Sequence, residues 1–202
     1  MTQSTTRRLM QRDERQAQIV RAAAVAFARG GFAATSMDDV ATEAGITRLI
    51  VYRHFDSKED LYRAVLTKVT ERLAEEWTAG LLLTDRRGFV FRMLLSVARE
   101  QPDGFRLLFE HAAREPQFAT FAQQVRATQV EMADQLIGVS IPDAEVRAWA
   151  TRTIVAYLDD SVLAWLEVDC PERDDEFIEL ATEGLVAMLL AWVPTPAAVL
   201  RR

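Results

Sequence analysis

The sequence predicts an all-α fold, and three observations support that prediction. Apolar residues recur at intervals of three and four along nearly the whole 202-residue chain, as they do on one face of a helix. No sustained alternation of period two marks a strand, and no Asn-Gly turn marks a hairpin. Turn-forming segments divide the chain into about nine helical stretches. Half of the residues are apolar, which is enough for a sizeable core.

The first helix is expected over about residues 10–29. Its buried face is formed by Ile19, Ala23, Ala26 and Phe27. The glycine pair at 30 and 31 follows at once, and glycine is the residue that most readily ends a helix.

Two short helices come next. Thr35 and Ser36 are candidate N-caps for the second helix, and Gly45 ends it. Its buried face is formed by Met37, Val40, Ala41 and Ala44. Thr47 then offers a cap for the third helix. Two short helices joined by a turn that contains glycine form the sequence pattern of a helix-turn-helix.

Six further helices complete the prediction. Ser57 caps a long fourth helix over about 58–80. Five more fall between the interruptions at residues 84–88, 101–104, 114–117, 140–143 and 169–175. The last two are long and unusually apolar, and Ala181, Gly184 and Ala187 are small enough for a close helix crossing. Such a pair from each subunit predicts a four-helix dimer interface, with internal core helices as the alternative.

The segment "GGFAATSMDDVATEAGITRLIVYRHFDSKEDLYRAVL", residues 30–66, resembles the DNA-binding domain of the TetR (tetracycline-repressor) family of bacterial transcription regulators. The matching features are the Gly-aromatic after the first helix, the Thr before the second, the Gly-Ile turn, the Tyr-x-His-Phe of the third helix and the Ser-Lys-Glu that opens the fourth. The resemblance implies a helix-turn-helix domain over 10–72 and a helical effector-binding and dimerisation domain over 73–202.

The resemblance also implies which residues meet DNA. Positions that usually contact phosphates in this family hold Thr35, Tyr52, His54 and Lys58. The groove-facing start of the recognition helix holds Thr47, Arg48, Leu49 and Ile50, and Ser36 and Arg53 lie beside these sets. Hydroxyl and ammonium groups suit phosphates, and an arginine can bind guanine O6 and N7. The alternatives are a core position for Tyr52, surface roles for His54 and Lys58, and a frayed tail rather than a DNA-tracking arm for Arg7, Arg8 and Arg12.

Leu49 and Ile50 depart from the small or polar residues that the family more often has there. At about 100° per residue, Val51 and Phe55 define the buried side of this helix and Leu49 falls on the opposite side, with Ile50 at the boundary. The thymine methyl is the apolar feature of the major groove. We therefore expect a thymine under Leu49, with an ordinary exposed leucine as the alternative.

Charge is distributed unevenly between the two predicted domains. The net charge is −6, but residues 1–66 hold ten Lys/Arg against eight Asp/Glu, whereas residues 67–202 hold fourteen against twenty-two. The first third of the chain is therefore suited to a polyanionic partner.

The second domain offers candidate contacts for a small-molecule effector of unknown identity. Adaptable or aromatic side chains that are candidates for lining its pocket are Met93, Phe105, Phe109, Trp149 and Tyr157, with ordinary core positions as the alternative. Asp159 and Asp160 lie on an apolar helix, where a surface position explains one and a pocket anchor explains the other.

Other functional classes find little support. The motifs of nucleophile elbows, P-loops and dinucleotide-binding loops are absent, and Cys170 with two histidines is too few for a metal site, so we expect no enzyme, cofactor or metal. A lone cysteine and apolar runs too short for a bilayer predict a cytoplasmic protein. The predicted function is a ligand-responsive homodimeric repressor on a pseudo-palindromic DNA operator. The alternatives are a regulator controlled by a protein partner and an enzyme in the second domain.

Overall fold

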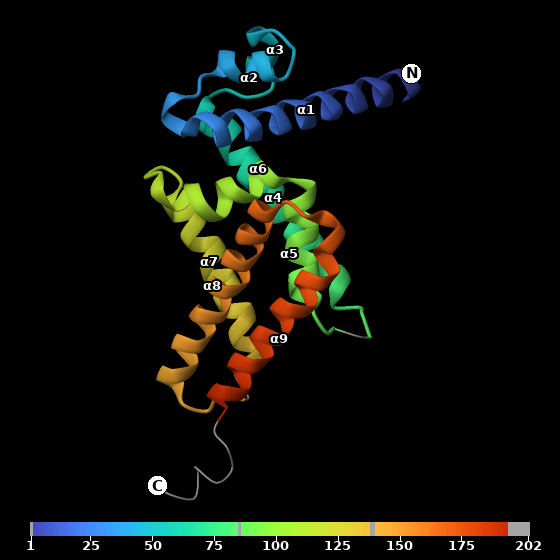
Figure 1. Ribbon diagram of the computed structural model, residues 1–202. Helices are drawn as coiled ribbons and strands as arrows, with labels where there is room; N and C mark the ends of the chain where they lie inside the picture. Colours follow the sequence, from blue (N-terminus) through green and yellow to red (C-terminus); the bar gives the residue numbers. More distant parts are fainter. Residues whose placement is uncertain (1, 85, 138–139, 194–202) are drawn as a thin grey trace, which may run out of the picture. The chain divides into compact units, whose positions relative to one another are not determined.

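The computed structural model describes residues 2–84, 86–137 and 140–193, and these residues contain helices and no strand (Figure 1). The α-helices are α1 (Thr2–Ala34), α2 (Met37–Glu43), α3 (Arg48–Tyr52), α4 (Lys58–Gly80), α5 (Phe89–Glu100), α6 (Pro102–Arg106), α7 (Ala119–Ile137), α8 (Ala144–Val168) and α9 (Asp174–Trp192). A π-helical turn at Leu107–His111 and 3-10 turns at Ala112–Arg114 and Pro171–Arg173 accompany them. The all-α prediction is confirmed.

The chain forms two compact units. The first contains the described residues up to Arg72 together with Gln101–Ala119, and the second contains Leu73–Glu100 with the described residues from Thr120 onwards. The division after residue 72 coincides with the expected domain boundary. Gln101–Ala119, which the sequence prediction assigned to the second domain, is part of the first unit.

Aromatic rings explain why Gln101–Ala119 belongs to the first unit. Phe118 stacks on Tyr62 of α4 with ring centroids 4.3 Å apart and meets Phe32 edge-on at 5.2 Å. Tyr62 in turn meets Phe27 of α1 at 5.0 Å. All four rings are buried, so this cluster joins three segments that are distant in the sequence.

Helix α1 extends further than expected at its start and breaks where the glycine pair predicts. It begins at Thr2 rather than near residue 10, because no breaker interrupts the intervening residues. Gly31 has φ 74° and ψ 163°, so the straight part of the helix ends there and 32–34 form a separate last turn.

The helix-turn-helix of the first unit is α2 and α3, which pack against each other while α2 packs on α1 (Figure 1). Ser36 caps α2 through a reciprocal capping box with Asp39, in which each side chain binds the other residue's backbone N–H. Thr47 occupies the N-cap of α3 without a side-chain hydrogen bond. The hydroxyl of Ser57 accepts a hydrogen bond from the backbone N–H of Asp60, which confirms the predicted cap of α4.

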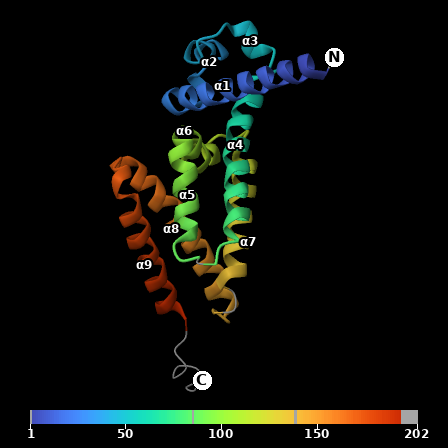
Figure 2. The ribbon, with the colours of Figure 1, turned by 90° about the vertical axis from the view of Figure 1, so that its right-hand side faces the viewer.

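In the second unit α5, α8 and α9 run alongside one another (Figure 2). Phe91 of α5 meets Tyr157 of α8 and Phe177 of α9, each with ring centroids 5.9 Å apart. A Cβ added at Gly184 would lie 2.5 Å from the Tyr157 hydroxyl, so the close crossing at this glycine joins α8 and α9 of the same chain. No helix among the described residues is long and apolar enough to cross a membrane.

Candidate functional site

The exposed side of the recognition helix α3 is the side that the sequence predicted. Leu49 is 62% exposed, whereas Val51 is fully buried and Ile50 lies between them. Tyr52 is 40% exposed, so it is not a core aromatic residue. The helix thus presents one large apolar side chain and one aromatic side chain on its open side.

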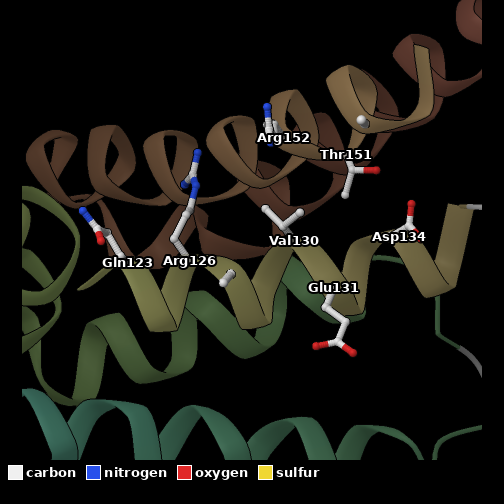
Figure 3. A pocket seen from close by; sticks show the side chains of 9 residues that line it. Gln123, Arg126, Val130, Glu131, Asp134, Thr151 and Arg152 are labelled. Atoms are coloured by element: carbon white, nitrogen blue, oxygen red, sulfur yellow. The ribbon is translucent and has the colours of Figure 1, made fainter. Parts of the chain in front are cut away.

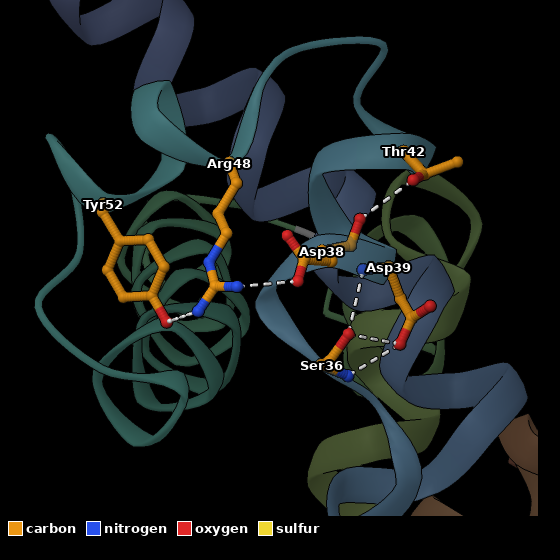
Figure 4. Close-up of polar contacts among 6 residues, drawn as sticks. All are labelled: Ser36, Asp38, Asp39, Thr42, Arg48 and Tyr52. Carbon is orange, nitrogen blue, oxygen red and sulfur yellow. Dashed lines mark hydrogen bonds and ion pairs between the residues drawn. The ribbon is translucent and has the colours of Figure 1, made fainter.

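Arg48 is held between two partners in the first unit. Its Nη1 donates a hydrogen bond to Oδ2 of Asp38 at 2.9 Å, and its Nη2 donates to the Tyr52 hydroxyl at 3.3 Å. The guanidinium carbon lies 5.1 Å from the centroid of the Tyr52 ring. Figure 4 shows Arg48 reaching from α3 to Asp38 on α2. The hydrogen bond with Tyr52, followed by the charge of Asp38, raises the pKa of Arg48, which therefore remains a cation.

Thr35 and Ser36 differ although they are neighbours. Thr35 is buried, and its hydroxyl lies 2.7 Å from the carbonyl oxygen of Gly31 and 3.2 Å from that of Ala26. This hydroxyl stabilises the turn after the α1 kink and is turned away from solvent. Ser36 is exposed at the start of α2, where its hydroxyl donates to Asp39. Of the two, Ser36 is the exposed one, and both its hydroxyl and its backbone N–H are bound to the Asp39 carboxylate.

Lys58 is engaged within the first unit. Its ammonium donates hydrogen bonds to the carbonyl oxygens of Phe32 at 2.8 Å and Ala33 at 3.3 Å, and it lies 4.4 Å from the centroid of the Phe32 ring. An ammonium has three N–H donors, so one remains after these two contacts. The side chain therefore links the start of α4 to the end of α1 and keeps one N–H donor.

His54 is half-buried, and its Nδ1 has no hydrogen-bond partner among the described residues. Burial, followed by the positive charges of Arg12 and Arg15, lowers the pKa of His54, so the imidazole is neutral near pH 7. Thr47 and Arg53 are exposed at the two ends of α3, and Arg12 is exposed on α1. The side chains of Arg7 and Arg8 lie outside those that the structure describes.

A groove of about 640 Å³ lies between α7 and α8 in the second unit (Figure 3). Its lining consists of Gln123, Arg126, Ala127, Val130, Glu131, Asp134, Ala148, Thr151 and Arg152. The α7 members follow one another at helical spacing, so they form a single stripe. Two guanidinium groups, two carboxylates and small apolar side chains therefore share one concave surface.

Arg126 is fixed in that groove by a buried carboxylate. Asp159 is 3% exposed; its Oδ2 accepts a hydrogen bond from Arg126 Nη1 at 2.9 Å and its Oδ1 accepts one from Gln129 Nε2 at 2.9 Å. Burial raises the pKa of Asp159 to about 7, although Arg126 and Gln129 act in the opposite direction. Asp160 is exposed. The structure thus separates the two aspartates, as the sequence suggested, and identifies Asp159 as the buried one.

The five residues expected to line an effector pocket do not line this groove. Phe105 is fully buried and contacts Phe109 at 4.5 Å, and both belong to the first unit. Met93 is buried, Tyr157 donates to the carbonyl oxygen of Ala181, and Trp149 is half exposed and meets Trp192 at 4.7 Å. Each of the five therefore packs against neighbours or lies on another surface.

Sequence reasoning did not identify Asp38 and Arg126 as site residues. Asp38 is ten residues before Arg48, and a usable signal was the pair of adjacent acids at the start of α2, of which one suffices for the capping box. Arg126 is 33 residues from Asp159, on another helix, and no sequence signal connects them.

Comparison with known proteins places this geometry among regulators. Residues 19–65 match the family model described as bacterial regulatory proteins, tetR family. The chain is 31% identical to the HTH-type transcriptional activator FasR of Mycolicibacterium smegmatis over 177 residues, which cover 83% of this chain and 80% of that protein. It is 38% identical to the HTH-type transcriptional repressor Rv3405c of Mycobacterium tuberculosis over 110 residues, which cover 50% of this chain and 55% of the repressor.

Solved structures share the fold at low identity. A TetR-like transcriptional regulator from Rhodococcus sp. RHA1 superposes with a TM-score of 0.71 at 19% identity and covers 87% of this chain and 93% of its own. The fatty acid degradation regulator FadR from Bacillus halodurans superposes with a TM-score of 0.65 at 17% identity and covers 84% and 93%. These solved structures share the arrangement of helices with this chain.

Proposed function

The chain belongs to the TetR family of bacterial regulatory proteins and is a DNA-binding transcriptional regulator, and from this premise we propose that it reads a pseudo-palindromic operator as an effector-controlled homodimer. The observation that carries the proposal is the exposed side of α3, where Arg48, Leu49 and Tyr52 are accessible together. Repression of transcription by operator occupancy, which the sequence predicted, is part of this proposal.

The DNA-reading surface, which we define as the exposed residues 47–49, 52 and 53 together with Lys58, combines phosphate contacts that position the protein with base contacts that read the sequence. Tyr52 and Arg53 offer an exposed hydroxyl and an exposed cation that suit phosphates, and Lys58 has one remaining donor for the same purpose. Thr47 is exposed at the groove-facing start of α3. We assign base reading to Arg48, which suits guanine, and to Leu49, which suits the thymine methyl.

Exposed apolar residues on α8 and α9 support a dimer. On α9, Leu180, Val186 and Leu190 are 61%, 44% and 72% exposed, and on α8 Trp149 and Val168 are 52% and 53% exposed. Large apolar side chains exposed along two neighbouring helices are typical of an interface. A two-fold dimer presents two recognition helices to half-sites about 34–36 Å apart, or a multiple of that spacing.

The groove between α7 and α8 is our candidate for the effector site. Arg126 and Arg152 offer hydrogen-bond donors, and Glu131 and Asp134 offer acceptors. Ala127, Val130 and Ala148 offer an apolar wall, so we propose an effector that carries both kinds of polar group on an apolar body. Asp159 positions Arg126, so a ligand that engages this arginine acts directly on the buried network of α8.

Selection of bound duplexes from a random pool by the purified full-length chain tests operator reading. We expect enrichment of a pseudo-palindrome, and Lys58→Ala should weaken binding to all duplexes alike with a log-log salt slope reduced by about one. Because Lys58 also holds carbonyl oxygens of Phe32 and Ala33, its melting temperature is measured in parallel. Failure to enrich any sequence at low salt would reject operator reading.

Filling the groove tests effector control without knowing the effector. In a Cys170→Ser background, Ala148→Cys is modified with N-ethylmaleimide, and Ala144→Cys, exposed on the same helix outside the groove, is the matched control. Modification at 148 should change operator affinity about fivefold or more, which is the usual scale of allosteric coupling. Identical affinities with and without the label would favour control by a protein partner instead.

A further inference from the structure

On the premise of the proposed DNA binding, we propose that Asp38 is a specificity-determining residue that holds Arg48 for base reading and keeps it from binding phosphate. Asp38 is the first-turn carboxylate of α2, and Arg48 is the first residue of α3. The ion pair therefore bridges the two helices of the helix-turn-helix on its exposed side (Figure 4).

The side chain of Asp38 does not cap α2. The capping box at the start of α2 consists of Ser36 and Asp39 alone. The backbone carbonyl of Asp38 accepts a hydrogen bond from the Thr42 hydroxyl one turn later, which leaves the Asp38 carboxylate for other contacts. Among the described residues, the hydrogen bond and ion pair recorded for the Asp38 carboxylate are both with Arg48. The first turn of α2 favours a carboxylate at this position, and the ion pair directs that carboxylate towards Arg48.

The two partners of Arg48 leave its bidentate edge available. Asp38 takes one N–H of Nη1 and Tyr52 takes one N–H of Nη2, while each terminal nitrogen carries two. One N–H remains on each, and two parallel donors are what guanine O6 and N7 require. The Tyr52 ring beside the guanidinium and the carboxylate at its end restrict its orientation before DNA arrives.

The carboxylate distinguishes bases from phosphates by charge. A guanine edge is neutral, so Arg48 can bind it while the pair with Asp38 is retained. A phosphate competes with Asp38 for the same cation and is itself repelled by the carboxylate. Affinity for random DNA, which is dominated by phosphates, should thus be lowered more than affinity for the operator.

The test compares Asp38→Asn with Glu43→Gln in the full-length chain. Glu43 lies on the same helix and pairs with Arg29, so its neutralisation makes the same change in net charge without touching Arg48. Dissociation constants are measured for the selected operator and for a random duplex across a range of salt concentrations. Asp38→Glu keeps a carboxylate and serves as the conservative variant, and melting curves verify that each variant is folded.

We expect Asp38→Asn to bind random DNA more tightly, with a log-log salt slope steeper by about one phosphate contact, and to lose about tenfold in the ratio of operator to random affinity. Selection with Asp38→Asn should relax the base positions that Arg48→Gln also relaxes, and Asp38→Glu should retain most of the ratio. An unchanged ratio, or a change equal to that of Glu43→Gln, overturns the role of Asp38. Wild type that enriches no operator overturns the proposed function instead, so the two failures are distinguishable.

Discussion

Two Arg–Asp pairs with the same nitrogen–oxygen distance of 2.9 Å lie in very different surroundings. Arg48 and Asp38, in the first unit, have side chains that are each 58% exposed. Arg126 and Asp159, in the second unit, have side chains that are 43% and 4% exposed. Water screens the first pair and reaches only one partner of the second. Burial rather than distance therefore decides how much each pair contributes to the stability of the fold.

Removal of each arginine gives the sharpest test of this comparison. Arg126→Met leaves the buried Asp159 without its cation and should lower the free energy of unfolding by about 2 kcal/mol at pH 8, below the range for fully buried pairs because the Arg126 side chain is 43% exposed. Arg48→Met should leave the unfolding midpoint unchanged, because both groups of its pair are hydrated. Urea unfolding at one fixed protomer concentration measures both variants. Equal effects of the two substitutions would contradict the comparison.

Gly184→Leu tests whether the packing of α8 against α9 stabilises the second unit. Gly184→Leu should lower the free energy of unfolding by about 2 kcal/mol, because the new side chain displaces Tyr157. Ala144→Leu is the control, since Ala144 is exposed at the start of α8 and is not among the residues proposed for the dimer interface. Dimerisation is followed by ultracentrifugation. If Gly184→Leu has wild-type stability but a weakened dimer, Gly184 lies at the subunit interface rather than at a crossing within one chain.

The pH dependence of stability tests the buried carboxylate. The pKa of Asp159 is raised from 3.8 to about 7 on folding, so between these values the folded chain holds a proton that the unfolded chain has released. This group's stabilising contribution is therefore complete below about pH 4 and is lost as pH rises towards 7, with a slope of up to about 1.4 kcal/mol per unit. Asp159→Asn should remove that slope. Free energies of unfolding are measured for both proteins from pH 4 to 7, and a constant difference between them across this range would contradict the assignment of the slope to Asp159.

The smallest expected effect concerns the exposed leucine of the DNA-reading surface. Leu49→Ala should cost about 1 kcal/mol of operator affinity, the scale of one disrupted base position, without changing stability. Replacing the thymine under Leu49 with uracil removes only a methyl group, so it should weaken wild type and not the variant. If both proteins weaken equally, or neither does, Leu49 is an ordinary exposed leucine.

Local physics made much of the first unit predictable. Helix periodicity placed Leu49 outward and Val51 inward, and the small polar residues before α2 and α4 gave the caps at Ser36 and Ser57. Each of these features depends on residues within one or two helical turns. Sequence spacing therefore determines them without knowledge of the rest of the fold.

The sequence by itself determined the helical class, the helix-turn-helix and the outward side of α3, because these follow from periods and caps a few residues long. Tertiary structure alone decided that Thr35 is turned inward, that Lys58 binds the carbonyl oxygens of Phe32 and Ala33, and that Gln101–Ala119 joins the first unit. It also selected Arg126 as the partner of Asp159. These outcomes depend on which distant segments bury one another, and a pattern of local spacing contains no record of that choice.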